Sequence, residues 1–278
     1  MLGAIFVSIG SLFEEIATLI GKKEIKKGEE SLYLMGFLSH CWVLVLFIII
    51  AFVRSDFVFS MASLSTFSLR AFLEIFQSHV TLLAVIYADR STVGFLRVLT
   101  LPLLLVVDVI LGYVISSKQM AGVGLIIVTL FVLFATQKIN RRGIYLVLFT
   151  ALNAVATISL YKYNITHYNS VTAEMIIMGT ILCLYFLTAG YVANKEDIFK
   201  EVFAKPIFVL QSLLQGTGTA FDAFAYSFAP ASVISTAKRS ASTILTMISG
   251  KLVFSERHMI VKSAAVVFLI IGIILLLT

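Results

Sequence analysis

The sequence predicts an all-α, polytopic membrane protein. Of its 278 residues, 60% are hydrophobic and only 13% are charged, whereas soluble domains carry about 25% charged residues. The mean hydropathy is +1.03, so lipid must solvate most of the surface. The apolar residues form uninterrupted runs, without the alternation that a lipid-facing barrel strand requires. These runs therefore predict helices.

Ten apolar runs are long enough to cross a bilayer, since a span needs about 20 mostly apolar residues. They cover residues 2–21, 32–53, 62–87, 92–115, 119–136, 144–162, 169–192, 206–227, 231–254 and 259–277. The polar intervals are too short for an independent soluble core. Glu14 and Glu15 interrupt the first run and nine further runs follow it, so we expect it to be retained as a helix and not cleaved as a signal peptide.

Lysine and arginine are distributed unequally between the loops. The odd-numbered loops hold Lys22, Lys23, Lys26, Lys27, Arg90, Lys138, Arg141, Arg142, Lys195, Lys200, Lys205 and Arg257, and the even-numbered loops hold Arg54, Lys118 and Lys162. The positive-inside rule then predicts cytoplasmic odd-numbered loops and, with ten helices, outward-facing termini. The compact loops favour a prokaryotic inner membrane. Loop orientation explains the net charge of +6 without nucleic acid, whose binders cluster basic residues on one soluble face.

The two halves of the chain resemble each other. Residues 88–92 and 115–120, on either side of an apolar helix, correspond in spacing to residues 227–231 and 254–259. Met35-Gly36 similarly corresponds to Met178-Gly179. Each half would contain five helices, so the repeats, residues 1–139 and 140–278, would lie inverted in the membrane. Many secondary transporters have this arrangement, with a site near the midplane.

A stretch of the second half carries a family resemblance. It contains Ala229-Pro230-Ala231-Ser232-Val233, Lys238-Arg239, Gly250, Phe254-Ser255-Glu256 and Ile271-Gly272-Ile273-Ile274. This pattern resembles the ten-helix, EamA-type proteins of the drug/metabolite transporter superfamily, which implies a carrier built from two repeats. The first half has Gly112-Tyr113 where members often have Gly-Glu, so the resemblance implies no symmetric glutamate pair. Lys238-Arg239 is similar to a pair that holds phosphate in plastid phosphate translocators.

Charged side chains within a span cost about 2.5 to 3.5 kcal/mol each on insertion scales, so they normally face a protein interior or a wet cavity. We predict a solute-binding site formed by Lys238, Arg239, Arg70, Glu74, Arg97 and Asp222. We expect Glu14, Glu15 and Asp108 to be coupling or cavity carboxylates. Glu174 is a further charged residue within a span.

Each prediction has an alternative. Arg70 and Glu74 share a helical face and line a polar pathway, or they form an internal pair that only cancels charge. Arg97 and Asp108 also share a face, being three turns apart. Lys238 and Arg239 bind an anionic group of the solute, or one of them extends to the membrane interface.

The carboxylates are similarly open. Glu14 and Glu15 carry a proton that drives exchange, or neutralise Arg97, Lys238 or Arg239. We place Asp222 near the cavity, although the glycines beside it more often allow helices to pack closely.

The chemistry that remains is transport. The two cysteines lie inside apolar runs, and no metal-ligand spacing, phosphate-cradling loop or nucleophile elbow is present. We therefore expect no cofactor, no metal and no enzyme activity. The expected function is secondary transport of a small organic metabolite, anionic or zwitterionic, by alternating access. An exporter of lipophilic or cationic drugs, a membrane-embedded enzyme acting on a lipid-linked substrate and a non-transporting scaffold are the alternatives. The partners are a small-molecule solute and the lipid bilayer, and the sequence leaves the oligomeric state open.

Overall fold

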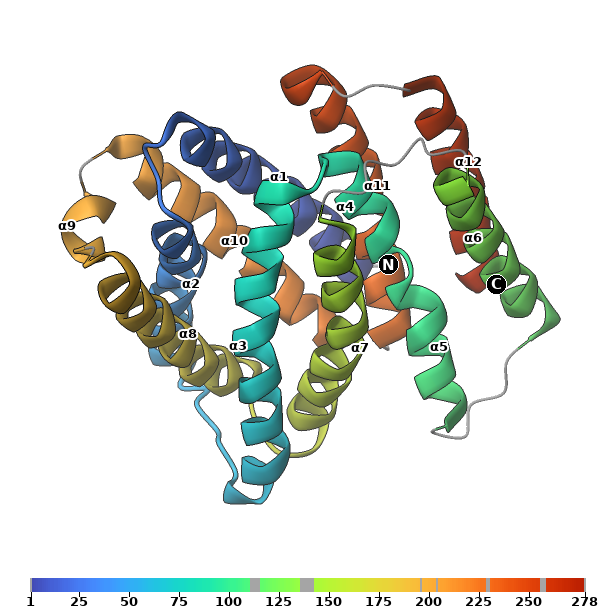
Figure 1. Cartoon of the computed structure of the whole chain (residues 1–278). Helices are drawn as coiled ribbons and strands as arrows, with labels where there is room; N and C mark the ends of the chain where they lie inside the picture. Colours follow the sequence, from blue (N-terminus) through green and yellow to red (C-terminus); the bar gives the residue numbers. More distant parts are fainter. Residues whose placement is uncertain are drawn as a thin grey trace.

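The computed structural model of the protein describes residues 2–110, 116–135, 143–195, 197–203, 205–228, 231–255 and 259–277. Every regular element in these ranges is a helix (Figure 1), which confirms the all-α fold class. The elements are α1 (Leu2–Lys27), α2 (Leu32–Arg54), η1 (Met61–Ser63), α3 (Leu64–Tyr87), α4 (Arg90–Arg97), α5 (Thr100–Ile110), α6 (Ser117–Ala135), α7 (Ile144–His167), α8 (Val171–Asn194), α9 (Ile198–Val202), α10 (Pro206–Phe228), α11 (Ala231–Phe254) and α12 (Met259–Leu277).

Helix covers most of each predicted apolar run in the part of the chain that the structure describes. Within the described residues, six stretches are long and apolar enough to cross a membrane: α1, α2, η1 with α3, residues 90–107 of α4 and α5, α7 and α8. Large apolar side chains also lie on the outside, such as Phe52, Tyr145 and Ile260, which are 85–88% exposed. Such a surface is stable in lipid and not in water. The chain is therefore built as a multi-pass membrane protein.

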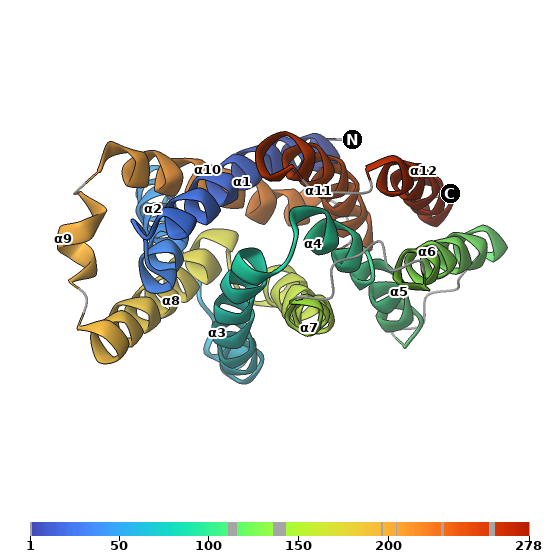
Figure 2. The same ribbon diagram turned by 45° about the horizontal axis from the view of Figure 1, so that its top comes forward.

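The helices pack in pairs that join early and late segments of the chain. α1 packs on α10, α2 on α8, α3 on α7, α4 on α11, and α6 on α12. Figures 1 and 2 show the α6–α12 pair at one edge of the molecule and the short α9 at the opposite edge. The other pairs lie between these edges. Helices from both halves of the chain therefore surround the centre.

The predicted span 92–115 is broken where α4 ends. Pro102 has no N–H to bond the carbonyl of Val98, and its ring crowds that carbonyl. The backbone responds with tighter turns: the N–H of Val98 donates to Phe95 O at 3.2 Å and that of Leu99 to Leu96 O at 3.1 Å. The break directly follows Arg97 and leaves this residue in the last turn of α4.

Small residues bring the central helices close together. A Cβ atom on Gly10 of α1 would lie 2.7 Å from the carbonyl oxygen of Gly218 on α10, and one on Gly218 would lie 2.7 Å from that of Gly10. On α4, a Cβ atom on Gly94 would collide with the side chain of Thr246 on α11. Glycine is therefore required at these crossings.

Candidate solute-binding cavity

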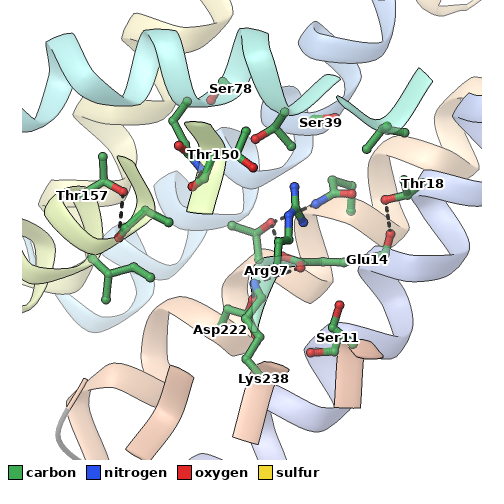
Figure 3. A pocket seen from close by; sticks show the side chains of 18 of the residues that line it. Ser11, Glu14, Thr18, Ser39, Ser78, Arg97, Thr150, Thr157, Asp222 and Lys238 are labelled. Atoms are coloured by element: carbon green, nitrogen blue, oxygen red, sulfur yellow. Dashed lines mark hydrogen bonds and ion pairs between the residues drawn. The ribbon is translucent and has the colours of Figure 1, made fainter. Parts of the chain in front are cut away.

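A central cavity of about 350 Å³ lies between α1, α2, α3, α4, α7, α10 and α11 (Figure 3). Its volume is in the range of small-molecule sites in proteins. Eight of the nine charged residues predicted from the sequence line it: Glu14, Glu15, Arg70, Glu74, Arg97, Asp222, Lys238 and Arg239. The ninth, Asp108, belongs to α5, but its side chain lies outside the described residues. The polar side chains that the spans carry thus converge on one place.

Lys238 is held between two carboxylates from different helices. Its Nζ lies 3.0 Å from Oε2 of Glu14 on α1 and forms an ion pair with Oδ2 of Asp222 on α10. The hydroxyl of Thr219 donates to the other oxygen of Glu14 at 3.3 Å. The close approach of α1 and α10 at Gly10 makes this grouping possible, because Gly10 faces Asp222 directly. Of the three cations that the sequence offered to the first span, Glu14 therefore pairs with Lys238.

Glu15 points to a different cation. Arg90 forms a two-point ion pair with its carboxylate, with Nε of Arg90 at 3.3 Å from Oε1. Ser249 of α11 donates to the same oxygen at 2.6 Å. The sequence analysis counted Arg90 as a loop residue, which was wrong: it is the first residue of α4 and is only 3% exposed. This cluster ties α1, α4 and α11 together.

Arg70 pairs with Glu174 of α8 and not with Glu74. The interpretation of Arg70 and Glu74 as an internal pair was therefore wrong. Glu174 is fully buried, and a carboxylate removed from water requires a cation. Asn169 donates to its second oxygen at 2.7 Å, and the Arg70 guanidinium also lies 4.5 Å from the ring centroid of Tyr161. Arg70, which lies one turn before Glu74 on α3, thus forms its ion pair with α8.

Arg97 and Arg239 remain. Among the residues that the structure describes, neither guanidinium group has a carboxylate within ion-pairing distance. Nε of Arg239 is buried without a hydrogen-bond partner in the same residues, and the residue is 7% exposed. Figure 3 shows Arg97 extending into the middle of the cavity. Both groups line a space open to a solute, and they repel each other electrostatically.

The chemistry of these two side chains is suited to an anion. Two guanidinium groups each present planar N–H donors, and a carboxylate or phosphate accepts such donors in pairs. Lys238 also faces the cavity, but its two carboxylates already neutralise it. The predicted cationic pair on α11 therefore divides into one structural and one available cation. In the described residues no cluster of three metal-ligating side chains occurs.

Sequence reasoning missed two partners. Arg90 follows a turn after α3 and looked like a loop cation, and Glu174 was recognised as a charged residue within a span but not placed in the site. The sequence did offer one signal, the balance of charges within the spans, because each cation buried there requires an acidic partner. Pairing across α3 and α8 has no sequence signature.

A scan against models of known protein families and a search of curated proteins found no match for this chain.

Proposed function

We propose that this protein is a secondary transporter that moves a small organic solute with an anionic group, anionic or zwitterionic overall, across a membrane by alternating access. The observation that carries the proposal is the pair of unmatched guanidinium groups, Arg97 and Arg239, in a cavity at the centre of a multi-pass helical protein. Cations withdrawn from water without an ion-pair partner are costly unless a ligand neutralises them. A solute anion supplies that compensation.

The helix pairing supports the two-repeat architecture within this proposal. We propose ten spans in two inverted five-helix repeats, residues 1–139 and 140–278, of the EamA type in the drug/metabolite transporter superfamily. Exchanging the halves maps the α1–α10 pair onto the α7–α3 pair, and maps α2–α8, α4–α11 and α6–α12 onto themselves. A two-fold relation of this kind allows one half to rock against the other around a fixed site.

The broken span also supports transport. Transporters commonly place their binding sites at discontinuous helices. Here the α4–α5 break directly follows Arg97, so a cavity residue sits beside a point where the backbone can bend. We propose that the odd-numbered loops face the cytoplasm of a prokaryotic inner membrane, on the charge distribution of the loops.

Ligand-dependent thermal stability tests the proposal. The purified full chain is heated with carboxylates, phosphorylated metabolites, amino acids and lipophilic cations, because a ligand that binds the native state raises its apparent stability, by about 2.7 kcal/mol at a hundred times Kd. We expect solutes with an acidic group to stabilise the wild type and the control Lys118→Gln, whose side chain is exposed on α6. Arg97→Gln and Arg239→Gln should each lose the effect.

Flux then separates a carrier from a binding protein. The stabilising solute should enter proteoliposomes that contain the wild type and not those that contain the Arg97→Gln, Arg239→Gln double variant. Stabilisation by lipophilic cations alone, unchanged in that double variant, would favour a cationic-drug exporter. Binding without flux would overturn the transporter proposal.

A further inference from the structure

Glu74 is the one cavity carboxylate in the described residues that has no ion-pair partner. Glu14 and Asp222 share Lys238, and Glu15 has Arg90, but no lysine or arginine nitrogen lies within 4.0 Å of Glu74. Thr157 on α7 lies beside it. A carboxylate that is partly removed from water and has no ion-pair partner has an unmet need for a cation.

The charges around the cavity balance as a whole. The three ion-paired groups described above contain three cations and four carboxylates. Arg97, Arg239 and Glu74 lie outside them and add two cations and one carboxylate. When these ten groups are all ionised, five positive charges therefore face five negative ones. A solute with a net charge would disturb this balance in a low-dielectric interior, whereas a net-neutral solute would not.

The unmatched groups occupy different walls. Arg97 and Arg239 come from α4 and α11 and act electrostatically on each other. Glu74 comes from α3, where its charged neighbours are Arg70 and Lys238. In the view of Figure 3, Thr157, which lies beside Glu74, is across the cavity from Glu14, with Arg97 between them. Glu74 therefore enters the cavity from a different helix than the two guanidinium groups.

We propose that Glu74 is an ammonium-binding subsite, and that the solute is a small zwitterion whose carboxylate or phosphate binds Arg97 and Arg239 while its ammonium group binds Glu74. This inference rests on the proposed function and narrows its substrate class. Each end of such a solute supplies the counter-charge that the protein lacks at that point.

The test compares each zwitterion with its singly charged counterparts. The probes are γ-aminobutyrate with butyrate and butylamine, phosphoethanolamine with ethyl phosphate and ethylamine, and α-amino acids with their des-amino acids. Apparent melting temperature is measured on the full chain in detergent for the wild type, Glu74→Gln and Glu74→Asp. Glu29→Gln is the control, because Glu29 is a half-exposed carboxylate paired with Lys205 away from the cavity.

We expect at least one zwitterion to bind the wild type and Glu29→Gln at least tenfold more tightly than both of its counterparts. Glu74→Gln should remove that preference and leave the binding of the anionic counterpart unchanged, and Glu74→Asp should retain part of it. Equal binding of zwitterion and anion in wild type and Glu74→Gln would overturn the ammonium subsite and leave the anion carrier standing. Loss of anion binding in Glu74→Gln, at unchanged unliganded melting temperature, would also overturn it. No binding by any probe would overturn both proposals.

Discussion

At Glu15 two helices supply partners to one buried carboxylate. Arg90 gives the charge and Ser249 a short hydroxyl donor. Neither side chain of the ion pair is more than 8% exposed, so water cannot replace a lost partner. The free-energy consequence of a substitution here depends on whether it removes one charge or both.

Arg90→Gln should lower the free energy of unfolding by about 3–5 kcal/mol, because it strands the buried Glu15 carboxylate. The double variant Arg90→Gln, Glu15→Gln should recover most of that loss. Equilibrium unfolding in detergent micelles of the wild type, both single variants and the double variant gives the coupling energy. A double variant as unstable as Arg90→Gln would contradict the pairing.

Glu30 lies in the turn between α1 and α2 and is only 5% exposed. Its Oε1 accepts a hydrogen bond from Gln211 of α10 at 2.8 Å, and its Oε2 has no partner among the described residues. Burial, with a smaller contribution from the nearby Glu24 carboxylate, raises the pKa of Glu30 to about 8 against the opposing Gln211 hydrogen bond. The folded protein therefore holds a proton here that the unfolded chain releases.

The stability of the wild type should fall relative to Glu30→Gln as pH rises from about 4.5 to about 8. The unfolded chain loses the Glu30 proton near 4.5 and the folded protein near 8, so folding binds a proton in this window and weakens with rising pH. Thermal denaturation at stepped pH values measures the difference. Curves that stay parallel across this window would contradict the prediction, and Glu29→Gln is the matched neighbour that should track the wild type.

The charged residues in the spans predicted which side chains line the cavity better than they predicted which cation pairs with which carboxylate. A charge within an apolar run must face inward, so the eight charged residues that line the cavity could be assigned to one interior from sequence. Which cation meets which carboxylate depends on helix crossings. The four-residue spacing of Arg70 and Glu74 made a local pair attractive, but Glu174 arrives from α8 and takes the cation.

At the scale of the element, α4 is placed by its contact with α11. Gly94 removes the side chain that would separate the two helices, and the hydroxyl of Thr243 reaches the Gly94 carbonyl at 3.4 Å. The contact fixes Arg97, one turn later, beside the helix that carries Arg239. Sequence predicted the apolar run, but the break and the second short helix depend on the backbone response to Pro102 that the structure reveals.

Gly94→Ala should destabilise the protein by about 1–3 kcal/mol, because the new methyl group overpacks against Thr246. Gly124→Ala on α6 is the matched control, since a Cβ atom there would meet nothing within 4 Å. It should be neutral or stabilising by up to about 1 kcal/mol. Denaturant unfolding of both variants decides, and equal effects would show that the α4–α11 crossing tolerates a side chain.

At the scale of the whole molecule, the all-α membrane architecture followed from composition and run length, because only lipid accommodates so apolar a chain. The five helix pairs could not be predicted in the same way. Apolar spans lack the directional signals that select neighbours, and the glycines that permit close approach do not name their partner. The inverted repeat was inferred from spacing and stays a proposal.

The proposed orientation predicts which loops are reachable from outside. In a variant with Cys41 and Cys183 replaced by alanine, Phe57→Cys lies in the second predicted loop and Lys23→Cys at the end of α1, both at exposed positions. A membrane-impermeant maleimide should label Phe57→Cys in intact cells, and Lys23→Cys only after permeabilisation. Labelling of the opposite set would reverse the assignment of the odd-numbered loops to the cytoplasm.

Because the ion-pair partners lie far apart in the sequence, they are synthesised at different times. α1, with Glu14 and Glu15, leaves the ribosome before the helices that carry its partners, because Arg90 begins α4 and Lys238 lies on α11. Domains usually fold in order of synthesis. Here, however, Glu14 of α1 receives its counter-charge from Lys238 of α11. The first half of the nascent chain therefore lacks a counter-charge for Glu14 while it is being inserted. We expect a truncated chain that stops before α11 to be recognised and degraded.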